Sequence, residues 1–329
     1  MKADLKLIEK LTSGAVKIAE TNGVYEFFRM TAQQGEILKQ INDFYMKSTA
    51  TSGIKMDFTT DARAIEFTGR FSEGSSRKYA FFDIYVNGVL TAHPGTGDYP
   101  QNPDFSIRLP LDGKTNRVTI YFPCLAKTVL KSFELIGASS VDAVKKNRKL
   151  LCYGDSITQG YDAEYPSFAY ANTFADALDA EIFNKAIGAE VFNPQFADAP
   201  DGFTPDIISI AYGTNDWSKH ISAENIKKNA TAFVTNLRKH YPDTPIIAIL
   251  PIWRKDNTEL RTAGKFSDML EILKKVYAGF SNITVIDGLR LTPHLPEFMK
   301  DGYLHPNDIG FQLMAKNLLL DPALQKYLK

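Results

Sequence analysis

The sequence predicts two domains, an all-β domain of the jelly-roll or β-sandwich type followed by an α/β domain with a five-stranded parallel sheet. Three observations predict them. Up to about Gly137, short apolar runs are separated by turn signals such as Asn87-Gly88, which is typical of antiparallel strands. Beyond Lys149, strand-like runs alternate with longer helical stretches, and this alternation gives a parallel sheet covered on both faces. The length of 329 residues suits two domains better than one core.

Mixed or alternating apolar runs in the first half indicate strands, with clear examples at residues 53–58, 64–68, 79–86 and 117–122. The pattern changes near Ser139, and a short charged stretch at 145–149 leads into the next strand. We therefore place the domain boundary there and predict domains at residues 1–145 and 146–329.

The second half alternates strands and helices from Lys149 onward. We expect strands at 150–153, 181–185, 207–212, 246–250 and 284–286, and helices at 167–178, 223–240, 259–278 and 307–320. In such a sheet the ligand crevice lies at the carboxyl ends of the strands. Candidate site residues should therefore follow the strand ends.

Composition excludes several functional classes. Hydrophobic residues make up 44% and charged residues 23%, as in ordinary globular proteins, and Lys+Arg and Asp+Glu are both 38. A chain without a strong field of one sign is not steered to nucleic acid or to an anionic membrane, so a neutral substrate fits better. Cys124 and Cys152 lie in apolar, strand-like runs, which predicts buried thiols rather than a disulfide framework.

The N-terminal residues carry frequent charges and lack the apolar core of a signal peptide, and no run approaches the roughly 20 apolar residues of a membrane span. We expect a cytoplasmic chain, although a secreted protein with its signal removed would have the same sequence.

Polar or small residues follow the first three predicted strands of the second half. The first strand ends in Gly154-Asp155-Ser156, where a small residue lets the chain turn and present a serine hydroxyl at the crevice. Gly188 follows the second strand and could bring a backbone N–H close to a ligand, and Asn215 follows the third and could donate to an oxyanion. Taken alone, each of these features can also be explained as an ordinary turn or helix cap.

A histidine near the C-terminus completes the set. His305 lies on the entry to the last predicted helix, where its ring could take the proton of Ser156, and Asp301 could fix its tautomer. A surface histidine beside a proline is the alternative for His305 alone. The four features occur at sites that one crevice could collect, so together they predict acyl transfer through a serine nucleophile.

These blocks resemble the four sequence blocks of the SGNH (GDSL-like) hydrolases over about residues 149–320. The resemblance implies a flavodoxin-like catalytic domain and a serine esterase without metal or cofactor. It also implies a nucleophile at Ser156, a base at His305, and oxyanion donors at Ser156, Gly188 and Asn215. The family usually spaces its acid and base as Asp-x-x-His, whereas Asp301 and His305 are one residue further apart. Either Asp301 completes a triad, or a Ser–His dyad operates.

The order of the two halves is similar to the carbohydrate esterases of family two, which join a jelly-roll unit to an SGNH unit and deacetylate polysaccharides. Residues 52–61 and 120–123 agree in character with these enzymes. This likeness favours deacetylation of a carbohydrate ester. A lysophospholipase or thioesterase acting on longer chains is the first alternative, and a carbohydrate-binding protein without catalysis is the second.

Trp217 and Trp253 follow the third and fourth predicted strands, so each is a candidate platform for a sugar ring, with core packing as the alternative. Asp155 and Asp216 are predicted to bind local backbone amides. The remaining histidines show no metal-ligand spacing, so no metal site is predicted. The oligomeric state stays open.

Overall fold

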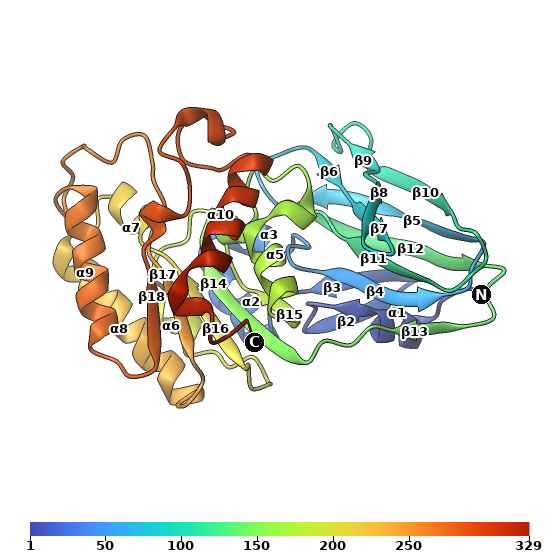
Figure 1. The fold of residues 1–329 in the computed structure, drawn as a ribbon, viewed down its shortest axis with the longest axis horizontal. Helices are drawn as coiled ribbons and strands as arrows, with labels where there is room; N and C mark the ends of the chain where they lie inside the picture. The colour runs from blue at the N-terminus through green and yellow to red at the C-terminus, as the bar shows by residue number, and fades with distance from the viewer. Residues whose placement is uncertain (329) are drawn as a thin grey trace.

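The computed structural model describes residues 1–328, apart from the side chain of Asn42. Figure 1 shows antiparallel sheets in the N-terminal half and a helix-covered parallel sheet in the C-terminal half. This is the predicted fold class. The division into domains at residue 145 stays a prediction, although β13 is the last strand paired within the N-terminal sheets and β14 is the first of the parallel sheet.

Two antiparallel sheets and a small strand pair form the N-terminal unit. One sheet has the order β1-β4-β11-β7-β8 with β13 beside β4, the other has the order β10-β5-β12-β3-β2, and β6 pairs with β9. A core of apolar side chains, many of them Phe, fills this unit. The strands are β1 (Thr12–Ser13), β2 (Lys17–Thr21), β3 (Val24–Phe28), β4 (Lys55–Thr60), β5 (Ala64–Glu73), β6 (Ala80–Phe81), β7 (Asp83–Val86), β8 (Val89–Ala92), β9 (Gly95–Thr96), β10 (Asp104–Pro110), β11 (Asn116–Tyr121), β12 (Ala126–Ile136) and β13 (Val141–Ala143).

The N-terminal half also contains helices α1 (Leu5–Leu11), α2 (Ala32–Lys39) and α3 (Asn42–Ser48), so the prediction of a wholly β-like segment from residue 14 to 137 is wrong at α2 and α3. Helix α2 begins with a capping box, in which Thr31 and Gln34 satisfy each other's backbone N–H groups. Leu38 and Phe44 from these helices pack into the core of the C-terminal unit. Their burial there stabilises two helices that are short for independent stability.

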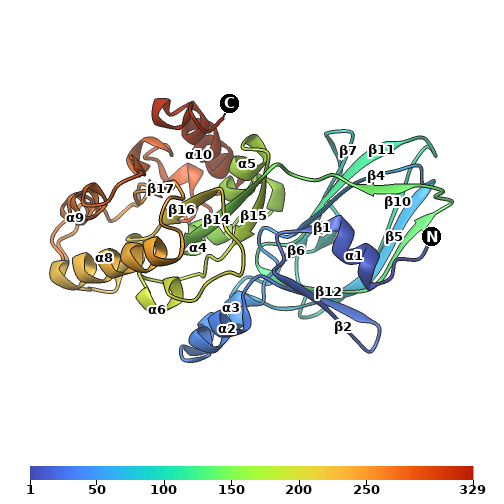
Figure 2. The same ribbon diagram turned by 90° about the horizontal axis from the view of Figure 1, so that it is seen from below.

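The parallel sheet has the order β15-β14-β16-β17-β18, which is the flavodoxin-like order. All five predicted strands are present, with bounds moved by at most two residues. Helices α8 and α9 pack on one face, and α5 and α10 pack on the other (Figure 2). The elements are β14 (Arg148–Gly154), α4 (Ser156–Gln159), α5 (Tyr170–Ala177), β15 (Ala180–Asn184), α6 (Pro194–Ala197), β16 (Ile207–Ala211), α7 (Thr214–Ser218), α8 (Ala223–His240), β17 (Ile246–Ile249), α9 (Phe266–Ala278), β18 (Ile283–Ile286) and α10 (Asp308–Leu320). Short 3-10 helices lie at Pro166–Phe168, Gly288–Arg290, Pro296–Phe298 and Pro322–Leu324.

Two predicted helices begin later than expected, α5 at Tyr170 instead of residue 167 and α9 at Phe266 instead of residue 259. Residues 259–265 are not helical, and α9 begins at Phe266. Arg261 and Gly264 exchange backbone hydrogen bonds, and Gly264 has a φ of +91°, a value that favours glycine and ends any continuous helix at this point. The two cysteines are free and buried, as predicted. Among the described residues, no helix combines the length and apolarity that a membrane span requires.

Buried polar contacts join the two units. The carboxylate of Asp83 on β7 accepts hydrogen bonds from the N–H (2.8 Å) and the hydroxyl (2.5 Å) of Ser167. Lys55 on β4 forms an ion pair with Asp176 on α5. A buried charge is stable only when it is paired and hydrogen-bonded, so these contacts hold the N-terminal unit against α5 and the 3-10 helix that precedes it.

Candidate active site

Ser156 lies at the end of β14, where the chain turns into the short helix α4. A side chain at Gly154 would collide with Thr158, so only glycine fits this tight strand-to-helix turn. The Asp155 carboxylate accepts the N–H of Ile157 at 3.0 Å and caps α4, as predicted. The turn holds the Ser156 hydroxyl at the carboxyl edge of the sheet.

His305 faces Ser156 across this edge. The Ser156 Oγ lies 2.9 Å from Nε2 of His305, and Nδ1 of the same ring lies 2.8 Å from Oδ2 of Asp301. The three predicted residues therefore form a continuous hydrogen-bonded chain. This is the arrangement by which an imidazole takes a serine proton while a carboxylate fixes its tautomer.

The extra residue between Asp301 and His305 is absorbed by a turn. Gly302 has a φ of +65°, and Oδ1 of Asp301 accepts the backbone N–H groups of Tyr303, Leu304 and His305 at 2.9, 2.8 and 3.1 Å. Burial alone would raise the pKa of Asp301, but these hydrogen bonds and the one from the His305 ring hold it well below its usual range. The carboxylate is thus ionised and aimed at the imidazole.

A second carboxylate near His305 escaped the sequence analysis. Asp162 Oδ2 lies 3.9 Å from Nδ1 of His305, and Asp162 is paired with Arg77 of the N-terminal unit through bonds of 2.5 and 2.8 Å. The Tyr161 ring lies between the Arg77 guanidinium (4.7 Å) and the His305 ring (4.9 Å). Nothing in the sequence near Asp162 signals this pairing across 85 residues.

Among the described residues, Asp162, Asp301 and His305 form the one group of ligand atoms close enough to share a metal ion. The Arg77 ion pair and the Asp301–His305 hydrogen bond already engage these atoms. These contacts explain why the three side chains lie close together.

Two of the predicted oxyanion donors, Gly188 and Asn215, already donate a hydrogen bond within the chain. A Cβ placed on Gly188 would be 3.8 Å from Cβ of Ser156, yet the Gly188 N–H donates to Oε1 of Gln159 at 2.7 Å. The Asn215 amide donates to the carbonyl of Glu190 at 3.1 Å. An amide NH2 has two hydrogens, so Asn215 keeps one for a ligand, whereas Gly188 has no second hydrogen.

Three buried carboxyl groups lie under this edge of the sheet. Burial raises the pKa of Glu190 to about 8, of Asp216 to about 7 and of Asp155 to about 6. Repulsion from neighbouring carboxylates raises the pKa of Glu190 and Asp216 further. Asp216 accepts the N–H of Phe192 at 3.3 Å, which is a backbone amide as predicted but lies 24 residues away in the sequence. Glu190 accepts the Tyr212 hydroxyl at 2.7 Å.

The prediction of Trp217 as a sugar platform is wrong. Its side chain is fully buried, Arg254 and Arg261 lie 5.0 and 4.2 Å from its ring, and its indole N–H donates to Gly264. Cation–π packing therefore occupies the ring in the core. Trp253 is 8% exposed and stacks on His294, and its contact with substrate stays a prediction.

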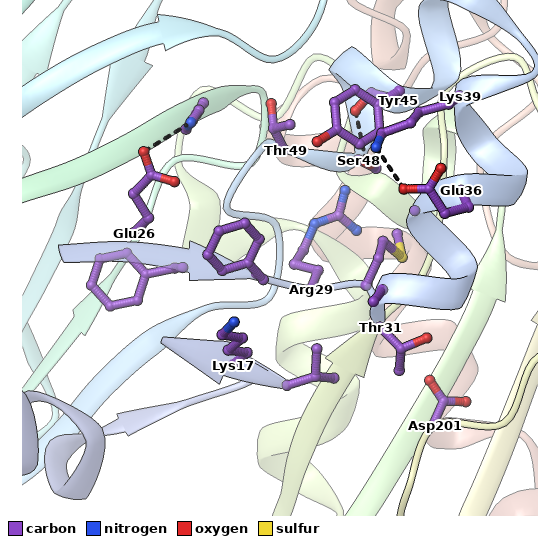
Figure 3. Close-up of a pocket in the computed structure, with 17 residues that line it drawn as sticks. Lys17, Glu26, Arg29, Thr31, Glu36, Lys39, Tyr45, Ser48, Thr49 and Asp201 are labelled. Carbon is purple, nitrogen blue, oxygen red and sulfur yellow. Dashed lines mark hydrogen bonds and ion pairs between the residues drawn. The ribbon is translucent and has the colours of Figure 1, made fainter. Parts of the chain in front are cut away.

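A cavity of about 430 Å³ is lined by residues of the N-terminal half together with Asp201. Figure 3 shows Arg29 inside it, with Lys17 and Glu26 from the strands and Tyr45 and Thr49 from the helical segment around it. Ser156, His305 and Asp301 do not line this cavity.

Comparison with known proteins gives the class of enzyme. Residues 152–313 match the GDSL-like Lipase/Acylhydrolase family, and this stretch contains the serine, glycine, asparagine and histidine described above. Residues 152–313 belong to this family, the SGNH hydrolases, which makes the protein an enzyme of the ester-hydrolysing or acyl-transferring type. No curated protein sequence matches the chain.

Solved structures share the fold over nearly the whole chain. The salicylyl-acyltransferase SsfX3 from a tetracycline biosynthetic pathway is 21% identical, with a TM-score of 0.80 over 93% of this chain and 92% of that one. A family two carbohydrate esterase from Cellvibrio japonicus is 16% identical, with a TM-score of 0.68 over 97% and 96%. One from Clostridium thermocellum, in complex with cellohexaose, is 16% identical, with a TM-score of 0.64 over 85% and 94%.

The pKa of Glu190 predicts how stability varies with pH. Its folded value of about 8 exceeds the ordinary 4.5, so between these values the native state holds a proton that the unfolded chain has lost. Native stability should therefore fall as pH rises through this window. Glu190→Gln stays neutral, so its melting temperature should fall less than that of the wild type between about pH 5 and pH 8. Equal falls in the two proteins would contradict the assignment.

Proposed function

We propose that the chain is a serine esterase that hydrolyses short acyl esters, with O-acetylated carbohydrates as its substrates. The observation that carries the proposal is the continuous chain of hydrogen bonds from Ser156 through His305 to Asp301. The sugar class is supported by the fold shared with family two carbohydrate esterases and with an acetyl xylan esterase from Butyrivibrio proteoclasticus.

In the proposed mechanism, Ser156 Oγ attacks the ester carbonyl while Nε2 of His305 takes its proton. Asp301 stabilises the resulting imidazolium at Nδ1. His305 then gives the proton to the leaving alcohol, and the acetyl group stays on Ser156. A water molecule, deprotonated by His305, attacks the acyl-enzyme; the bond between the acyl carbon and Ser156 Oγ breaks, His305 returns the proton to Oγ, and acetate is released.

The negative charge on the tetrahedral oxygen needs donors that are already in place. We assign this work to the N–H of Ser156 and to the second amide hydrogen of Asn215. Gly188 joins them only when its N–H is shared between Gln159 and the substrate oxygen, because Gln159 accepts it at 2.7 Å in this structure. Of the three predicted oxyanion donors, we therefore propose Ser156 and Asn215 as full donors and Gly188 as a shared one.

An acyltransferase is the second candidate, because the salicylyl-acyltransferase has the same fold with a TM-score of 0.80. The first half of the reaction would be unchanged, and an acceptor alcohol would replace water in the second half. The longer-chain lysophospholipase or thioesterase differs instead in the acyl group that it accepts.

Acyl-chain preference tests the proposal directly. With 4-nitrophenyl esters, we expect kcat/KM for acetate to exceed that for octanoate by at least about tenfold, since a site shaped for acetyl has no room for six further methylenes. The reverse order would support the long-chain alternative.

Product analysis distinguishes hydrolysis from acyl transfer. Free acetate should remain the main product when excess sugar alcohol is added, and an acetylated alcohol as the main product would identify an acyltransferase.

Asp301→Asn distinguishes a triad from a dyad. The amide would present a hydrogen or a neutral oxygen to Nδ1 and lose the charge that stabilises the imidazolium, so kcat should fall by at least about a hundredfold. The pH–rate profile of the variant beside wild type is the measurement. A loss below about threefold would assign catalysis to the Ser156–His305 dyad.

A further inference from the structure

Three consecutive backbone carbonyls beside Ser156 each accept a hydrogen bond from a side-chain nitrogen. We name residues 188–190 the oxyanion loop. Its contacts are Lys47 Nζ to the Gly188 carbonyl at 3.2 Å, Lys219 Nζ to the Ala189 carbonyl at 2.5 Å, and Asn215 Nδ2 to the Glu190 carbonyl at 3.1 Å. Ala189 has a φ of +68°, a conformation that residues other than glycine rarely adopt without support. The loop is therefore held by its surroundings.

Lys47 comes from helix α3 of the N-terminal half and holds Gly188 from two sides. Its ammonium group donates to the Gly188 carbonyl, while its own backbone carbonyl accepts from Nε2 of Gln159 at 3.2 Å. Oε1 of that same Gln159 amide accepts the Gly188 N–H at 2.7 Å. The partners fix the orientation of the amide, because an N–H only donates and a carbonyl only accepts. These contacts close a ring through Lys47, Gln159 and Gly188.

The segment before the loop is held by the same part of the chain. Arg29 is 1% exposed, and its guanidinium donates to the carbonyls of Asn184 (2.5 Å) and Ala186 (3.2 Å). It also donates to the carbonyl of Lys47 at 3.1 Å. In Figure 3, Arg29 extends from the strand segment toward the segment that carries Ser48 and Thr49. Arg29 and Lys47 thus join β15 and the oxyanion loop to the N-terminal half.

We propose that Lys47 is a positioning residue of the active site, which holds the oxyanion loop so that the Glu190 carbonyl orients the Asn215 amide toward the substrate oxygen. The proposal rests on the proposed function, because that function assigns Asn215 its role as a donor. Preorganised donors act only if they are in place when the charge develops, and small misplacements cost large factors in rate. Binding of the ground-state ester depends much less on this orientation.

The test compares Lys47→Met with Lys47→Arg in the full chain. Methionine keeps the length and apolar stem but removes the ammonium donor, so kcat on 4-nitrophenyl acetate should fall by at least about tenfold with KM changed by less than about twofold. Arginine can donate to the same carbonyl and should recover most of kcat. Lys39→Met is the matched control, because Lys39 lies on the neighbouring helix α2 and pairs with Glu36 instead. It should retain wild-type kcat.

Hydrogen–deuterium exchange supplies a readout that does not need activity. Peptides that cover residues 186–191 should exchange faster in Lys47→Met than in wild type, and at the wild-type rate in Lys39→Met. Unchanged exchange, or faster exchange with unchanged kcat, would overturn the proposal. A rise in KM in place of a fall in kcat would also overturn it. If the wild type hydrolyses no ester, the proposed function fails, and the exchange rates still decide whether Lys47 holds the loop.

Discussion

The position of β14 between β15 and β16 is the constraint on which the site depends. The segments that leave these three neighbouring strands carry Ser156, Gly188 and Asn215, and parallel strands bring them to one edge of the sheet. In sheets of this topology, ligands bind at the edge where the strand order reverses, which here is the carboxyl end of β14. Only His305 arrives from elsewhere, and the turn around Asp301 aims its ring at Ser156. The arrangement of Ser156, Gly188 and Asn215, on which the proposed chemistry rests, thus follows from the sheet topology, and one loop adds His305.

The N-terminal half contributes to the same edge. Arg77 pairs with Asp162 beside His305, and Arg29 and Lys47 hold the segment that leads to and includes the oxyanion loop. Because Arg77 engages the Asp162 carboxylate, Asp301 is the carboxylate that pairs with the His305 imidazole. Buried hydrogen bonds of this kind are costly to break, because the remaining group stays without a partner. The N-terminal unit is therefore joined to the C-terminal unit by polar contacts close to His305 and Gly188.

Local patterns allowed the parallel sheet, its strand ends and the neighbourhood of Ser156 and His305 to be predicted from the sequence. These features rest on periodicity and on short motifs, which are visible within a few residues. The contacts of Arg77 and Lys47 were not predictable, because they join residues 85 and 141 positions apart and have no local signature. Trp217 was misjudged since only the fold shows Arg254 and Arg261 covering its ring. The α2–α3 helices were missed because their apolar side chains pack in a core formed much later in the chain.

The central claim is that Ser156 is a nucleophile activated by His305. Intact-mass and peptide measurements after treatment with a fluorophosphonate test it most directly, because this reagent reacts covalently with an activated serine. We expect one adduct per chain, located on the peptide that contains Ser156, with none in Ser156→Ala and much slower labelling in His305→Ala. A wild-type chain that stays unmodified, or an adduct on a different residue, would contradict the claim.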